Sequence, residues 1–205
     1  MLYSELQCSE AIRQAVERMG FAEMTEIQEK TIPVMLAGHD VIAKAPTGTG
    51  KTCAFGIPVA EHIQPKNKYP QAVIMAPTRE LAQQIAEELT NLTYFMPEVQ
   101  VACVYGGANM EKQAKRLAEG CQIVVATPGR LMDHYKHHSI DISHVTQIVL
   151  DEADEMLNMG FYKDVRHIIE MMKARKALSM FSATISREVM DIGWLYQHNA
   201  EEITV

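Results

Sequence analysis

Short apolar runs rich in valine and isoleucine alternate along the chain with longer segments in which apolar residues recur at helical spacing. This alternation is typical of a parallel sheet whose strands are joined by helices, so we predict an α/β fold. The expected strands are residues 41–45, 72–76, 99–104, 122–126, 147–150 and 177–181, with a last one at 203–205. The expected helices are residues 79–92, 110–118, 130–136, 161–173 and 187–196.

Length and charge limit the number of domains and the way in which a polyanion could bind. The 205 residues, 47% of them hydrophobic, suit one ordinary domain with a substantial core, so we expect a single domain over residues 1–205. The clearest exposed loop is residues 64–71, which carries two prolines. A formal net charge of -7 gives no overall positive field to attract a polyanion, so any nucleic acid would have to bind a local patch.

The four cysteines indicate the compartment. Cys8, Cys53, Cys103 and Cys121 show no C-x-x-C spacing, and nothing near the first residues resembles a secretory signal. No apolar stretch approaches the ~18 residues that a membrane span requires. We therefore expect free thiols in a cytoplasmic protein that does not insert into membranes.

A glycine-rich segment follows the first expected strand and precedes a helical run: Pro46-Thr47-Gly48-Thr49-Gly50-Lys51-Thr52. Its glycines let main-chain N–H groups approach phosphate oxygens, and the start of the helix adds positive potential. Lys51 would reach the β and γ phosphates of a nucleotide, and the Thr52 hydroxyl would bind Mg²⁺. A plain turn with a solvent-facing lysine is the alternative, but the order strand, loop, Lys-Thr pair, helix favours a phosphate loop.

Two details of this segment qualify the prediction. The general phosphate-loop pattern has glycine where this chain has Ala45. Pro58 lies within the helix that follows, so that helix should kink or break after its first turns.

Two carboxylates follow the expected strand at 147–150. Asp151 would accept a hydrogen bond from a water bound to Mg²⁺, and Glu152 would orient or deprotonate the water that attacks the phosphate. Alone, these residues would equally suit the solvated acidic start of a helix. Together with the phosphate loop, they favour nucleotide hydrolysis and make Lys51, Asp151 and Glu152 the candidate catalytic residues.

The phosphate loop begins with Ala45, and further along the chain comes Asp151-Glu152-Ala153-Asp154. Both segments resemble those of the DEAD-box family of RNA helicases, which is named after the second and whose phosphate loop begins with alanine. Other similar segments, in the family's order, are Pro77-Thr78-Arg79-Glu80-Leu81, Gly106-Gly107, Thr127-Pro128-Gly129-Arg130 and Ser182-Ala183-Thr184. The resemblance implies a RecA-like fold with a mainly parallel sheet, RNA-dependent ATP hydrolysis with ATP and Mg²⁺, and local remodelling of RNA duplexes by two such lobes.

Residues 20–28 resemble the family's Q motif, which recognises adenine. A glutamine carboxamide can read adenine by one donor and one acceptor, so Gln28 would select ATP over GTP. The resemblance implies that Phe21 stacks on the base and that Thr25 ties the segment to the phosphate loop. Met24 replaces the family's usual proline, and Tyr3 is the candidate for its upstream aromatic residue. Without the other motifs, an ordinary helix with a surface glutamine would explain the segment.

The resemblance also implies an RNA-binding path over strand ends. Hydroxyls, glycines and arginines at the expected strand-to-helix junctions would hold the RNA backbone without reading sequence: Pro77, Thr78, Arg79, Gly106, Gly107, Thr127, Pro128, Gly129 and Arg130. Thr127 is a good helix N-cap, with Pro128 at the first helical position. Individually, capping and turn formation explain each segment as well.

Ser182 and Thr184 resemble the motif that couples the ATP site to RNA remodelling, with Asp154 as a hydrogen-bond acceptor. The alternative is that these hydroxyls end a strand and cap the helix near Arg187. A GTPase is disfavoured because Asn67-Lys68-Tyr69-Pro70 lacks the aspartate of a guanine-reading motif. A clamp that binds RNA without hydrolysis stays open. The resemblance implies a second RecA-like lobe as partner, and we expect this chain to be a monomeric portion cut from a longer protein.

Overall fold

The computed structural model describes residues 1–46, 48 and 50–205. Its centre is a sheet of seven parallel strands in the order β3-β4-β2-β5-β6-β1-β7. The strands are β1 (Val41–Lys44), β2 (Ala72–Met75), β3 (Val101–Val104), β4 (Ile123–Ala126), β5 (Gln147–Asp151), β6 (Ala177–Ser182) and β7 (Glu201–Thr204). Because all pairs are parallel, every strand ends at the same edge of the sheet.

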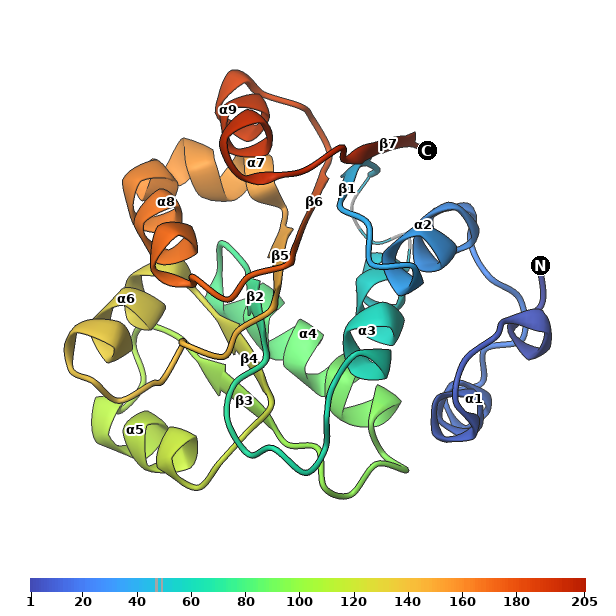
Figure 1. The fold of residues 1–205 in the computed structure, drawn as a ribbon, viewed down its shortest axis with the longest axis horizontal. Helices are drawn as coiled ribbons and strands as arrows, with labels where there is room; N and C mark the ends of the chain where they lie inside the picture. Colours follow the sequence, from blue (N-terminus) through green and yellow to red (C-terminus); the bar gives the residue numbers. More distant parts are fainter. Residues whose placement is uncertain (47, 49) are drawn as a thin grey trace.

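Helices cover both faces of the sheet (Figure 1). One layer contains α1 (Glu10–Arg18), α2 (Glu26–Leu36), α3 (Lys51–Glu61) and α4 (Arg79–Leu92). The opposite layer contains α5 (Met110–Ala118), α6 (Pro128–Lys136), α7 (Ala153–Met156), α8 (Tyr162–Met171) and α9 (Arg187–Tyr196). Two short turns complete the order, η1 (Tyr3–Glu5) and the π-helical η2 (Leu157–Phe161).

Side chains alternate between the two helix layers along each strand. Val73 and Met75 of β2 pack against the α5–α9 layer, whereas Ala72 and Ile74 pack against the α1–α4 layer. The strands are therefore buried on both faces, which explains their continuous apolar runs. The predicted α/β class is confirmed. No helix in the described part of the chain is long and apolar enough to cross a bilayer.

Most expected elements are present, some with other bounds. The helices at 79–92, 110–118 and 187–196 have the bounds predicted. The last strand is β7 at Glu201–Thr204 rather than 203–205. The sequence analysis did not assign α1 or α2 as helices. Helix α2 contains Pro33 in its interior, where proline lacks the N–H that a helix uses.

The break expected at Pro58 was wrong. Helix α3 runs without interruption from Lys51 to Glu61 with Pro58 inside it. Pro58 cannot donate a hydrogen bond to the Ala54 carbonyl, yet the helix continues for three more residues to Glu61. The helix that follows the phosphate loop is therefore intact.

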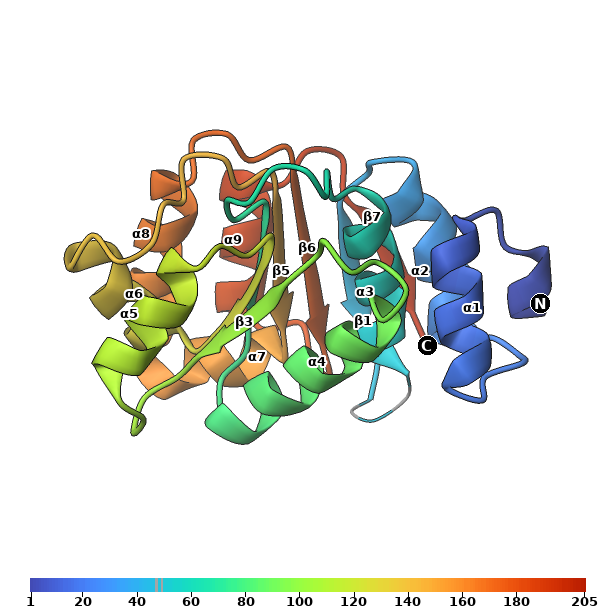
Figure 2. The same cartoon turned by 90° about the horizontal axis from the view of Figure 1, so that it is seen from below.

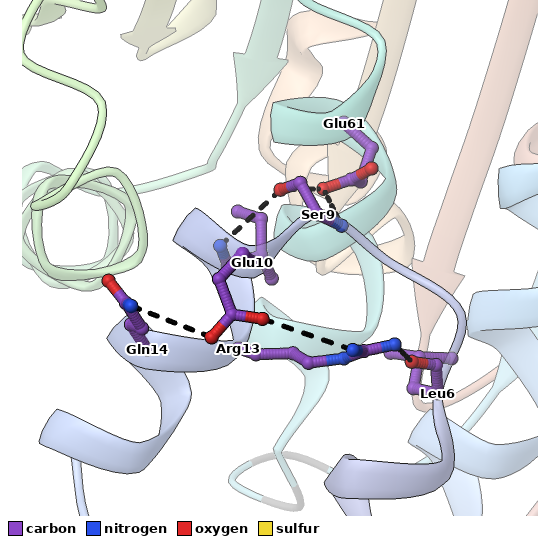
Figure 3. A network of polar contacts seen from close by, with 7 residues as sticks. Leu6, Ser9, Glu10, Arg13, Gln14 and Glu61 are labelled. Atoms are coloured by element: carbon purple, nitrogen blue, oxygen red, sulfur yellow. Dashed lines mark hydrogen bonds and ion pairs between the residues drawn. The ribbon is translucent and has the colours of Figure 1, made fainter.

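The N-terminal segment is tied to the far end of α3 (Figure 3). The Ser9 N–H and hydroxyl donate to Glu61 Oε1 at 3.0 and 2.6 Å, and Arg13 Nη2 donates to the Leu6 carbonyl at 2.8 Å. Figure 2 shows α1 and the preceding turn beyond α2, at one end of the molecule. These bonds hold the segment that carries Tyr3 against the layer containing the phosphate loop.

Candidate functional site

A pocket of about 350 Å³ opens where β1 and β5 end. It is lined by residues of the phosphate loop, of β5 with the residue after it, and of one helix: Gly48, Gly50, Lys51, Thr52, Leu81, Gln84, Glu88, Asp151 and Glu152. Strand β6 lies between β1 and β5, so the sheet order brings the glycine-rich segment and the carboxylates together. Thr47 and Thr49, also predicted to bind nucleotide, lie outside the described residues.

Lys51 is the cation of this pocket. Its Nζ lies 3.4 Å from Asp151 Oδ1, and both side chains are almost fully buried. The ammonium has no hydrogen-bond partner within the described residues, although it can donate three bonds. A buried ammonium that makes no hydrogen bond is costly even beside a counter-charge, unless a ligand supplies acceptors. Lys51 therefore fits an anionic ligand such as a phosphate group.

The phosphate loop has the backbone conformation that its glycines allow. Gly48 and Gly50 have φ angles of 82° and 77°, in the left-handed region where a side chain is strained. A Cβ on Gly50 would lie 2.6 Å from Gln28 Nε2 and 3.1 Å from Thr25 Oγ1. Gly50 is also the N-cap residue of α3, so the positive end of that helix faces the pocket.

The carboxylates differ in environment. Burial raises the pKa of Asp151, opposed by Lys51 and by the Glu152 N–H, which donates to Asp151 Oδ1 at 3.0 Å. Burial, followed by a hydrogen bond with Glu155, raises the pKa of Glu152 to about 7. Glu152 also has a φ of 49°, an uncommon conformation for a residue other than glycine. Strained backbone of this kind concentrates at functional positions.

Three pocket residues on α4 were missed by the sequence analysis. Leu81, Gln84 and Glu88 are spaced by three and four positions, which places them on one helical face. Burial raises the pKa of Glu88, while a hydrogen bond from Thr52 opposes the shift. The helical spacing was visible in the sequence, but it did not show that this face turns toward the phosphate loop.

The donor set fits Mg²⁺. The pocket that contains Lys51 is also lined by side chains with hard oxygen donors of the kind that Mg²⁺ prefers: Thr52, Glu88, Asp151 and Glu152. No group of three or more acidic, histidine or cysteine side chains within the described ranges is arranged to hold a metal by itself.

The segment expected to read adenine contacts the phosphate loop. Gln28 is 3% exposed, and its Nε2 donates to the Gly50 carbonyl at 3.1 Å. Its Oε1 accepts from the Thr25 N–H at 3.0 Å and from the Tyr3 hydroxyl. The bond from Gln28 to Gly50 joins this segment to the phosphate loop. The adenine-reading role of Gln28 stays a prediction. Phe21 is half exposed and stacks on Tyr3 at 6.4 Å between ring centroids.

The candidate coupling residues are connected directly. Thr184 donates to Asp154 Oδ2 through its hydroxyl at 2.7 Å and its N–H at 3.1 Å. The Asp154 N–H donates to Ser182 Oγ at 3.0 Å. The predicted contact of Asp154 with Ser182 and Thr184 is thus present, although the Ser182 hydroxyl also accepts a bond from the Asp154 N–H. Helix α9 is capped by Ser186, so the alternative in which these hydroxyls cap it is wrong.

Around the first candidate RNA segments, Arg79 is exposed, and its guanidinium carbon lies 4.7 Å from the centre of the Tyr105 ring. Gly107 has a φ of 84°, and a Cβ there would lie 3.6 Å from Arg79 Nη1. Thr78 accepts from the Leu81 N–H at 3.2 Å and caps α4. The ends of β2 and β3 therefore bring Arg79 and Gly107 together, as predicted from the parallel sheet. Pro77 is buried behind them.

The last candidate RNA segment shows one difference from prediction. Thr127 and Pro128 occupy the N-cap and first position of α6, but the Thr127 side chain makes no capping bond. Arg130 Nη1 donates to the Ala108 carbonyl at 3.0 Å and to Gln113 Oε1 at 3.1 Å. Gln113 was missed by the sequence analysis. Its carboxamide also donates to the Tyr105 carbonyl, so it links the segment after β3 to Arg130.

Comparison with known proteins decides the family. The model of the DEAD/DEAH box helicase domain matches residues 25–192, most of the chain and all of the pocket described above. The chain belongs to the DEAD/DEAH box helicase family. The segments that resembled this family in sequence run from Gly20 to Thr184. All of them from Thr25 onward lie within the matched range, and the resemblance to the family is confirmed.

Two relatives of this DEAD/DEAH box chain are ATP-dependent RNA helicases named CshA. The protein of Listeria monocytogenes is 47% identical over 99% of this chain, and that of Geobacillus kaustophilus is 44% identical over 99%. The chain spans 39% and 43% of their respective lengths. It therefore corresponds to less than half of each relative.

Solved structures show the same fold. A DEAD box protein from Methanococcus jannaschii is 39% identical with a TM-score of 0.91, covering all of this chain and 56% of that one. A hypothetical ATP-dependent RNA helicase from Sulfolobus tokodaii is 41% identical with a TM-score of 0.89, covering 96% and 57%. The parallel sheet with flanking helices is thus the RecA-like fold of this family.

Proposed function

We propose that this chain is the ATP-binding lobe of a two-lobe RNA helicase, in which RNA-dependent ATP hydrolysis drives local separation of RNA duplexes. The observation that carries the proposal is the buried Lys51 ammonium, which has no hydrogen-bond partner among the described residues and faces a pocket at the start of α3. A phosphate group would supply both the missing acceptors and the negative charge.

The residues of the pocket have separate roles in binding and hydrolysis. Lys51 and the main-chain N–H groups of the phosphate loop hold the β and γ phosphates. Thr52 and Asp151 hold Mg²⁺, partly through water, and the ion neutralises charge on the phosphates when bound. Glu152 orients or deprotonates the attacking water from the mouth of the pocket. Asp154 and Thr184 connect this segment to the end of β6 and are candidates for coupling it to RNA.

RNA would lie along the ends of β2, β3 and β4. Arg79, Gly107 and Arg130 all lie at this edge, next to the nucleotide pocket at the ends of β1 and β5. Backbone and arginine groups of this kind position a nucleic acid without reading its sequence. A second RecA-like lobe in the longer parent protein would complete both sites, and the parent would act as a cytoplasmic monomer.

Adenine selectivity tests the nucleotide assignment. The chain should bind ADP more tightly than GDP in a calorimetric titration, and Gln28→Ala should remove the preference, at a cost of about 1–3 kcal/mol for one bidentate contact. The ratio of the two affinities is the quantity to follow, because Gln28 also bonds to Gly50. If Gln28→Ala only disturbed the phosphate loop, the affinities for ADP and GDP would fall by the same factor.

The exposed Gln14→Ala serves as control. Equal binding of GDP and ADP by the unmutated chain would contradict the adenine assignment.

A further inference from the structure

The carboxamide of Gln28 is almost fully occupied by the protein itself. A carbonyl oxygen has two lone pairs, and Oε1 accepts one bond from the Thr25 N–H at 3.0 Å and one from the Tyr3 hydroxyl. On the other side, Nε2 donates one of its two hydrogens to the Gly50 carbonyl. Among the described residues, the second Nε2 hydrogen has no acceptor and is available to a base, whereas both lone pairs of Oε1 are used.

Adenine has an exocyclic amine, a donor, where guanine has an exocyclic oxygen, an acceptor. The amine of adenine needs an acceptor on the protein, whereas the ring nitrogen beside the amine needs a donor. In this structure Gln28 can supply the donor alone. Reading both groups therefore requires one of the two bonds to Oε1 to open.

The two donors to Oε1 differ in how easily they can leave. The Thr25 N–H belongs to the capping box that starts α2, and a main-chain N–H cannot turn without moving the helix end. The Tyr3 O–H rotates about its C–O bond and can point away while the ring stays in place. Tyr3 is thus the donor that competes with an incoming base.

The ring of Tyr3 is held firmly. The Tyr3 N–H donates to the Ala22 carbonyl at 3.0 Å, and the Met24 N–H donates to the Met1 carbonyl at 2.9 Å, so the chain before η1 lies along residues 22–24. The side chain is 6% exposed and stacks on Phe21. Burial raises the pKa of the Tyr3 hydroxyl far above its usual value, so the group remains a donor at neutral pH.

We propose that the Tyr3 hydroxyl is a specificity-determining group that weakens adenine binding by competing with the exocyclic amine of the base for Oε1 of Gln28. This inference rests on the proposed function, in which Gln28 reads adenine. Phenylalanine at position 3 would keep the ring and its stacking on Phe21 but would free one acceptor lone pair. The hydroxyl thus sets how much of the reading capacity of Gln28 is available to ATP.

Titration of ADP and GDP against Tyr3→Phe tests the inference. ADP affinity should rise about two- to tenfold, the range expected when one competing hydrogen bond is removed. GDP affinity should not change, because the guanine oxygen is an acceptor and gains nothing from a free lone pair. The matched control is Tyr196→Phe, which removes a hydrogen-bonded phenol on α9 away from the pocket and should change neither affinity.

The double variant Tyr3→Phe/Gln28→Ala separates the inference from the proposed function. It should show no gain over Gln28→Ala alone, because the freed lone pair no longer exists. If Gln28→Ala leaves the ratio of ADP to GDP affinity unchanged, the adenine-reading role itself is wrong. If Gln28→Ala removes the preference but Tyr3→Phe leaves ADP affinity equal or lower, only the competition is overturned, and the hydroxyl supports Gln28 instead.

Discussion

Glu152→Gln should lower RNA-stimulated ATP turnover by the complete two-lobe protein by about 10²–10⁴-fold, the usual contribution of a general base. The side chain lines the pocket beside Asp151, and its pKa is raised to about 7, which suits a group that takes up a proton. Glutamine keeps the size and hydrogen bonding of glutamate but cannot accept the proton. Nucleotide binding should therefore persist, as measured by titration with Mg-ADP beside the steady-state hydrolysis assay.

The control for this variant is Glu87→Gln, which makes the same change at an exposed position of α4. Its turnover should equal that of the unmutated protein. Full turnover by Glu152→Gln would remove that carboxylate from the mechanism and leave water activation to another group.

Lys51→Met should weaken Mg-ADP binding about 10- to 150-fold, because the ammonium would make a charge-assisted bond to the β phosphate worth about 1.5–3 kcal/mol. Methionine keeps the buried stem and removes the charge. The measurement is calorimetric titration of the isolated chain. Lys44→Met is the control, since Lys44 is an exposed cation at the end of β1.

The Lys51 variant also needs a check of its fold. Removing Lys51 leaves Asp151 buried without a counter-charge, and its carboxyl group should take up a proton rather than stay charged. A cooperative melt of Lys51→Met shows that lost binding reflects the phosphate contact. Unweakened binding by a folded Lys51→Met would contradict the role given to this lysine.

Much of the fold followed from local patterns. Strands buried on both faces read as valine- and isoleucine-rich runs, and helices such as Arg79–Leu92 show regular apolar spacing. The candidate site also followed in part, because the chemistry-bearing residues stand directly after strands and all strands of a parallel sheet end at one edge. That reasoning placed Lys51 and Asp151 together without knowledge of the strand order.

The remaining features depend on tertiary packing. Which face of α4 turns to the phosphate loop is set by the sheet order, so Glu88 could not be assigned to the pocket from spacing alone. The left-handed backbone of Glu152 could not be predicted from its residue type, because such positions usually carry glycine or asparagine rather than glutamate. The bond from Tyr3 to Gln28 joins residues 25 positions apart and depends on how η1 folds over residues 22–24.

We expect this chain to bind the nucleotide without completing the catalytic site. Within the described residues that line the pocket, Lys51 is the one cation and no arginine is present. An arginine that stabilises the transition state of phosphoryl transfer is worth ~10³–10⁵ in rate, and separating a duplex needs two bodies that close on the RNA.

The most direct measurement is steady-state ATP hydrolysis by the purified chain with and without saturating RNA, alongside displacement of a short duplex. The predicted result is ADP binding with no RNA stimulation of turnover and no displacement. Robust RNA-stimulated turnover by this chain alone would show that the arginine and the second closing body lie within these 205 residues, and the assignment of this chain as one lobe of two would be wrong.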